Sequence, residues 1–124
     1  MPQDRAFLRF VYDAGLAEIH GLDLDRQRLH GEPHDGNRIL TAHGLRWIDL
    51  ESCCVGPLEW DLAYQSAEVV SAFPEVDDEL LRRLRRLNRA RIATWCWGMA
   101  RFPEMRWHGQ VHLDALRAEL DLPS

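Results

Sequence analysis

The side chains with carboxylate or amide oxygens between residues 32 and 51 include Glu32, Asn37, Asp49 and Glu51. Asn and Asp offer the oxygen ligands that a hard cation such as Mg²⁺ prefers. A loop between two short strands would bring such side chains together. The same residue types are also common in turns, where they only shape the backbone. Residue types alone therefore leave a cation site and a structural turn as alternatives.

Three short motifs surround these side chains in a fixed order. They are His30-Gly31-Glu32-Pro33-His34-Asp35-Gly36-Asn37, then Trp47-Ile48-Asp49-Leu50-Glu51, then Glu59-Trp60-Asp61-Leu62-Ala63. Together they resemble the catalytic loop, the metal-binding strand and the following helix start of the aminoglycoside phosphotransferase family. This family comprises antibiotic and small-molecule kinases related to protein kinases. The resemblance is good over roughly residues 16 to 64 and vague over the C-terminal helices.

The resemblance implies transfer of a phosphoryl group from ATP or GTP to a hydroxyl of a small molecule, either aminoglycoside-like or an amino alcohol. By position Glu32 would be the catalytic base, where the family has Asp, and Asn37 and Asp49 would hold Mg²⁺. Glu51 would contact a cationic substrate. Glutamate keeps the charge of aspartate but is longer by one methylene, on the order of 1.5 Å.

Two further residues take supporting roles in the same resemblance. His30 would pack beneath the catalytic loop and hydrogen-bond its backbone. Asp61, at a helix start, would accept hydrogen bonds from the amides of that loop, and an acidic side chain is favourable at a helix N-terminus in any case.

The expected fold is mainly α with a small β-hairpin (α+β), like the C-lobe of a protein-kinase-like phosphotransferase. Nothing before Ala6 could supply the nucleotide-binding lobe, and the chain contains no lysine for the Lys–Glu pair that holds the nucleotide. We therefore expect little kinase activity from the isolated chain. The alternatives are a non-catalytic, truncated homologue that binds a ligand or partner, and one half of a split enzyme whose N-lobe is a separate polypeptide.

Hydrophobic periodicity and turn residues predict the elements. We expect helices over residues 4–19, 59–73, 77–102 and 110–120, a connection over 20–29, a hairpin from 38–41 and 45–50, and a loop over 52–57. Asp77 or Asp78 would cap the long helix. Its apolar face would comprise Leu80, Leu81, Leu84, Leu87, Ile92, Trp95 and Met99, and Pro103 would stop it.

Size and composition indicate one folded domain over residues 1–124, with 46% hydrophobic residues and five tryptophans. A net charge of −5 disfavours unspecific nucleic-acid binding. We see no signal peptide and no apolar run of the roughly 20 residues that span a membrane. Three cysteines do not make a disulfide framework, so we expect a cytoplasmic protein.

Three other groups of residues have structural explanations that we prefer. His34, His43, Cys53 and Cys54 fit no standard zinc spacing, so we expect no zinc site. The arginines between Arg82 and Arg91 would form a solvated helix flank paired with Glu75, Asp77, Asp78 and Glu79, and not a phosphate- or RNA-binding face. Trp95, Trp97 and Trp107 would lie in the core or in an interface. A homodimer through Phe7, Phe10, Val11 and Leu16 is the expected self-association.

Overall fold

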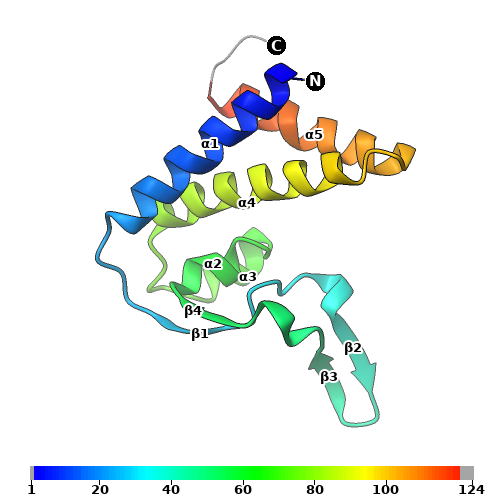
Figure 1. Ribbon diagram of the computed structural model, residues 1–124. Helices are drawn as coiled ribbons and strands as arrows, with labels where there is room; N and C mark the ends of the chain where they lie inside the picture. Colours follow the sequence, from blue (N-terminus) through cyan, green and yellow to red (C-terminus); the bar gives the residue numbers. More distant parts are fainter. Residues whose placement is uncertain (1, 121–124) are drawn as a thin grey trace. The chain divides into compact units, whose positions relative to one another are not determined.

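A computed structural model of the chain describes residues 2–120. Along the sequence, one long N-terminal helix comes first, short helices and strands follow, and two long helices come last (Figure 1). The helices are α1 (Pro2–His20), η1 (Asp35–Asn37), η2 (Leu50–Ser52), α2 (Leu58–Leu62), α3 (Ala67–Ser71), α4 (Asp78–Gly98) and α5 (Pro103–Glu119). The strands are β1 (Gln27–Leu29), β2 (Arg38–Thr41), β3 (Gly44–Trp47) and β4 (Cys54–Gly56). The structure is mostly helical with little β content, compatible with the α+β class. No helix within residues 2–120 is long and apolar enough to cross a membrane.

The chain divides into two compact units, and the boundary falls inside α4. The helical unit contains the chain up to Leu22 and from Arg86 onward, whereas the central unit runs from Asp23 to Arg85. Every residue of the three motifs lies in the central unit.

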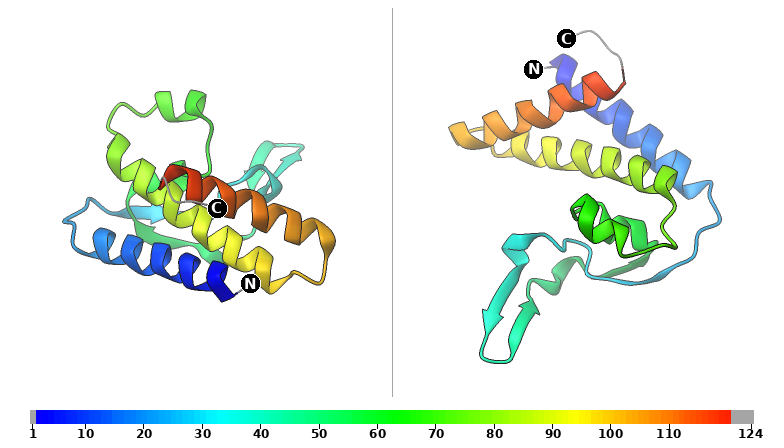
Figure 2. Two further views of the ribbon diagram at one scale, coloured as in Figure 1. Left: turned by 90° about the horizontal axis from the view of Figure 1, so that it is seen from above. Right: turned by 180° about the vertical axis from the view of Figure 1, so that it is seen from behind.

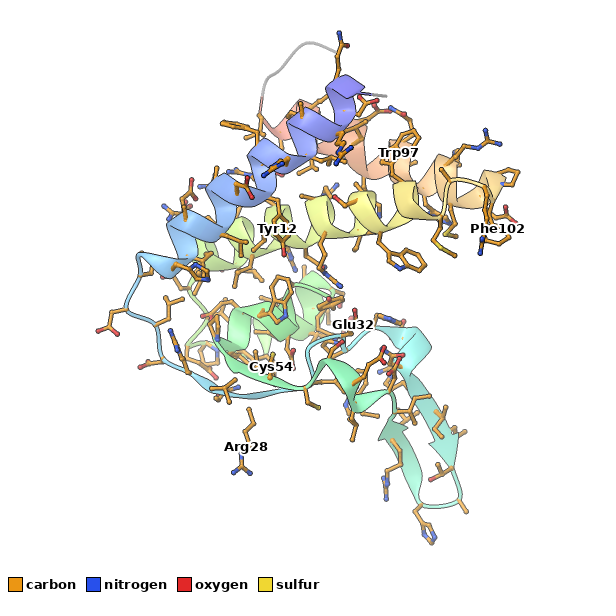
Figure 3. The ribbon with its side chains drawn as sticks, in the orientation of Figure 1. Tyr12, Arg28, Glu32, Cys54, Trp97 and Phe102 are labelled. Atoms are coloured by element: carbon orange, nitrogen blue, oxygen red, sulfur yellow. The ribbon has the colours of Figure 1, made fainter. Side chains whose placement is uncertain are left out.

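The helical unit is built from α1, the later part of α4, and α5, which lie side by side in both views of Figure 2. Its buried apolar cluster consists of Leu8, Val11, Ala90, Ala93, Leu113 and Leu116. The Arg117 guanidinium lies 2.6 Å from the Asp4 carboxylate, which joins the first and last helices. Tyr12 and Trp97 line a groove between α1 and α4 (Figure 3).

The central unit carries two small antiparallel sheets. β2 pairs with β3 as the predicted hairpin, with Leu40 opposite Leu45, but the second strand ends at Trp47 and not at the predicted Leu50. β1 pairs with β4, with Leu29 opposite Cys54. The sequence did not predict this second sheet, because it indicated a connection over residues 20–29 and a loop over residues 52–57. Strands of three residues are too short to show an alternating pattern, and their pairing joins segments far apart in the sequence.

The prediction of one helix over residues 59–73 was wrong. The structure has two short helices here, because the chain turns after Leu62 and starts again at Ser66. The Ser66 hydroxyl accepts a hydrogen bond from the Val69 amide, 3.3 Å away, and so caps α3. The Gln65 side chain donates to the Pro33 carbonyl, so this break also contacts the loop between β1 and β2.

The predicted end of the long helix was also wrong. α4 ends at Gly98, and Pro103 begins α5 instead of stopping α4. Proline is favoured at the first position of a helix because it has no amide hydrogen to satisfy there. At the other end the Asp77 carboxylate accepts from the Leu80 amide at 3.0 Å, as expected of a cap.

The apolar face of α4 contains small residues where large ones were predicted. Trp95 is 61% exposed, and the buried stripe continues from Leu87 through Ala90, Ala93 and Cys96. Small side chains let α5 approach closely, because a Cβ on Gly109 would lie only 3.1 Å from the Cys96 Cβ. Periodicity weighted by side-chain size therefore selected the wrong face of the second half of α4.

Arg82, Arg83 and Arg86 of α4 form ion pairs, although not always with the predicted partners. Arg82 and Arg83 both contact Glu79, and these hydrogen bonds lower the pKa of the Glu79 carboxyl. Arg86 lies 2.9 Å from Glu119, which the sequence had not suggested.

His112 on α5 is expected to make folding sensitive to acid. Burial, together with Arg89 and His108, lowers the pKa of His112 below its ordinary value of 6.5, and its Nδ1 is buried without a hydrogen-bond partner. The unfolded chain therefore takes up a proton first as the pH falls through 6.5, and stability is lost from there down to the folded-state pKa. We expect His112→Gln to lose less stability than the wild type between about pH 7.5 and pH 5.5 in urea unfolding. The same change at exposed His43 is the matched control variant.

Candidate active site

The loop between β1 and β2 passes very close to the segment that carries Asp49 and Glu51. Gly31 in this loop has φ +92°, a conformation that side chains disfavour. A Cβ at this position would lie 2.0 Å from the Ser52 carbonyl oxygen. Only glycine therefore allows the loop to lie against the end of η2.

The Asp61 carboxylate of α2 holds the start of this loop. Its Oδ2 accepts a hydrogen bond from the His30 amide and its Oδ1 accepts one from the Gly31 amide, both at 2.9 Å. Hydrogen bonds to an ionised acceptor are among the stronger ones in proteins. Asp61 thus joins α2 to the loop backbone at two consecutive residues.

The His30 ring connects the loop to the strand segment before Asp49. Its Nε2 lies 2.8 Å from the Ile48 carbonyl oxygen, and its Nδ1 lies 3.2 Å from the Glu32 amide. A carbonyl oxygen can only accept and an amide can only donate, so the proton belongs on Nε2. In that form one ring fixes the backbone of Glu32 relative to that of Ile48.

Asn37 makes a second connection between the same two segments. Its side chain is 7% exposed, and its Nδ2 donates to the Glu32 carbonyl at 2.8 Å. The backbone carbonyl of Asn37 accepts a hydrogen bond from the Ile48 amide at 2.8 Å. The bond from Nδ2 sets the amide orientation and makes Oδ1 the atom that can bind a cation.

Three carboxylates converge where these segments meet. One oxygen from each of Glu32, Asp49 and Glu51 lies within 4.8 Å of the others. Asp49 has φ 59° and ψ 69°, the only positive φ of a non-glycine residue in the described part of the chain. Strained residues of this kind are enriched at functional sites. Figure 3 shows Glu32 on the loop that joins β1 to β2.

Comparison with known proteins places the chain in a family. The model of the phosphotransferase enzyme family matches residues 2–102. The chain belongs to this phosphotransferase family. No curated protein and no solved structure matches the chain.

The loop of this phosphotransferase-family chain thus brings together most of the residues that the sequence singled out. Glu32, Asp49 and Glu51 meet at one point, while His30 and Asp61 contact the loop backbone. The roles assigned to these residues in catalysis and cation binding remain predictions.

Two features of the site were not predicted. Gly31 belongs to the first motif, but the sequence did not predict that its backbone lies against the Ser52 carbonyl. Cys54 on β4 lies near Asp61, and partial burial, followed by the charges of Asp61 and Cys53, raises the pKa of its thiol. A raised pKa favours the neutral thiol, which is a poor nucleophile and a poor metal ligand.

Proposed function

We propose that this phosphotransferase-family chain is a kinase-like C-lobe that carries the cation site and the base for phosphoryl transfer. The donor would be ATP or GTP, and the acceptor would be a hydroxyl of a small molecule, aminoglycoside-like or an amino alcohol. One observation supports this most strongly: the carboxylates of Glu32, Asp49 and Glu51 converge on a loop that Asp61 supports.

The residues at this point suit Mg²⁺. The converging side chains offer oxygen atoms only, which is the ligand set of a hard cation. Three carboxylates this close also repel one another, and a divalent cation would offset that repulsion. Asp49 and the Oδ1 of Asn37 would hold the ion, which when bound would balance the charge of the donor phosphates.

Glu32 would act as the base. The hydroxyl oxygen of the acceptor attacks the γ-phosphorus, its proton passes to the Glu32 carboxylate, and the bond to the bridging oxygen breaks to release the nucleoside diphosphate. Positioning dominates such chemistry, and a misplacement of about 1 Å can cost roughly a hundredfold in rate. The contacts of His30 and Asn37 with the Glu32 backbone would hold the longer glutamate in place.

Glu51 has two roles open to it in this proposal. It was predicted to contact a cationic substrate, and its exposed position is compatible with that. Its carboxylate oxygen is also close enough to that of Asp49 to bind the same cation. Glu51→Gln would separate the two roles, because a substrate contact leaves cation affinity unchanged and a cation contact does not.

A second candidate function is binding without catalysis, or catalysis only as one half of a split enzyme. The observation in its favour is composition. These 124 residues include 15 arginines but no lysine for the nucleotide-clamping pair. In that case the loop would serve as a ligand- or partner-binding surface, or would be completed by a separate polypeptide.

Cation binding tests the proposal directly. We expect the chain to bind Mn²⁺, measured by electron paramagnetic resonance of the free ion, and Mg²⁺ to compete for the same site. Asp49→Asn should weaken binding by about tenfold or more, because one charged ligand is lost. Asp35→Asn is the matched control, since Asp35 lies on the same loop but pairs with Arg38 at 2.7 Å. Equal affinities of the two variants would contradict the proposed site.

A further inference from the structure

One face of α1 is exposed and has no partner within the described part of the helical unit. Leu8 and Val11 are buried in the core of this unit, at 5% and 4% exposure. On the opposite face, at helical spacing, lie Ala6, Phe10, Asp13 and Ala17, all exposed. Phe10 is 66% exposed and is the one large apolar side chain among these four residues. The buried position of Val11 also means that the dimer surface expected from the sequence needs correction.

Two opposite charges lie on or beside this exposed face, Arg9 and, one turn later, Asp13. Arg9 and Asp13 are 3.5 Å apart and their side chains are 80% and 65% exposed. Two such helices side by side therefore attract when they run antiparallel and repel when they run parallel.

The same arrangement is self-complementary about a twofold axis. If the axis passes level with residue 11, antiparallel packing places Arg9 level with Asp13 of the partner subunit, and Asp13 level with Arg9 of the partner subunit. The rise of about 1.5 Å per residue keeps these pairs in register. Phe10 then lies near the partner's Phe10, and the small Ala6 and Ala17 allow the helices to approach closely. An isologous interface requires this kind of reciprocal match.

We propose that the occupant of this face is a second copy of the chain, packed antiparallel through α1, with Phe10 as the buried anchor and Arg9–Asp13 as the reciprocal charge pairs. Aromatic anchors near the centre of an interface carry much of its binding energy. The charge pairs set the orientation of the two helices more than the affinity. This inference is independent of the proposed catalytic function, because it rests on the helical unit alone.

Sedimentation equilibrium of the full 124-residue chain over a roughly hundredfold concentration range tests the proposal. The wild type is expected to show a reversible monomer–dimer equilibrium. Phe10→Glu should weaken dimerisation at least about thirtyfold. Trp107→Glu is the matched control, because Trp107 is an aromatic residue of similar exposure, 63%, on α5, and it should stay within about threefold of the wild type.

Charge reversal supplies the sharper test. Arg9→Glu alone places like charges opposite each other twice and should weaken the dimer about tenfold. Adding Asp13→Arg to the same chain restores opposite charges, so the double variant should return to within about threefold of the wild type. Circular dichroism of each variant shows whether α1 remains folded. A wild type that stays monomeric, equal losses for Phe10→Glu and Trp107→Glu, or a double variant that stays as weak as Arg9→Glu would each overturn the proposal.

Discussion

Replacement of Gly31 by alanine is expected to destabilise the central unit by about 3 kcal/mol or more. Two costs combine at this position. The backbone has φ +92°, which an L side chain rarely adopts, and the added Cβ would lie 2.0 Å from the Ser52 carbonyl oxygen. Because the clash is with backbone, a side-chain rotation cannot relieve it, and the loop must move away from η2. We expect Mn²⁺ binding to fall together with stability.

Two other glycines separate these costs. Gly44 has φ +96°, but an added Cβ there would meet only the Arg46 side chain, at an ordinary contact distance of 3.8 Å, so Gly44→Ala should cost only the backbone term, about 1–2 kcal/mol. Gly98 lies in α4 with nothing within 4 Å of an added Cβ, so Gly98→Ala should be neutral or stabilise by up to about 1 kcal/mol. Urea unfolding followed by circular dichroism gives the three values. A Gly31→Ala variant no less stable than Gly44→Ala would show that the loop does not need the close approach to Ser52.

The parts of the fold that sequence could predict are those with local causes. The β2–β3 hairpin follows from apolar segments that flank a turn, and its pairing has Thr41 opposite Gly44. The β1–β4 pairing joins Gln27 to Gly56 and has no local signature. At the break between α2 and α3, the Gln65 side chain contacts the Pro33 carbonyl, a tertiary interaction that periodicity cannot show.

The candidate site divides in the same way. The resemblance of the three motifs singled out Glu32 and Asp49, and the loop and hairpin between them bring their carboxylate oxygens within 4.8 Å. The role of Gly31 could not be read from spacing, since its reason is the position of the Ser52 carbonyl. The face of α1 shows a related limit: Val11 was expected in a dimer surface, yet it lies in the core at 4% exposure, while its neighbour Phe10 is 66% exposed.

The second large effect concerns turnover by the isolated chain. We expect the 124-residue polypeptide to bind a divalent cation but to transfer phosphate from ATP several powers of ten more slowly than a typical kinase, whose turnover is on the order of 1–100 per second. Catalysis of this reaction is almost wholly positioning and charge stabilisation. The chain has no lysine, so the Lys–Glu pair that holds the nucleotide phosphates cannot form within it.

Radiolabelled ATP with an aminoglycoside or an amino alcohol as acceptor measures this directly, and the cation-binding assay on the same sample shows whether the site is intact. Any residual phosphoryl transfer is attributed to the carboxylate cluster only if substitutions in the cluster abolish it. Transfer by this site should disappear in Glu32→Ala and Asp49→Asn and persist in Asp35→Asn, whose carboxylate pairs with Arg38 outside the carboxylate cluster. Turnover near the usual kinase range with that pattern of losses would show that Glu32 replaces aspartate fully and that the cation site, without a lysine clamp, is enough to position the donor. Cation binding without transfer would instead favour a binding module or one half of a split enzyme, since the loop geometry would then be intact while the phosphates lack half of their contacts.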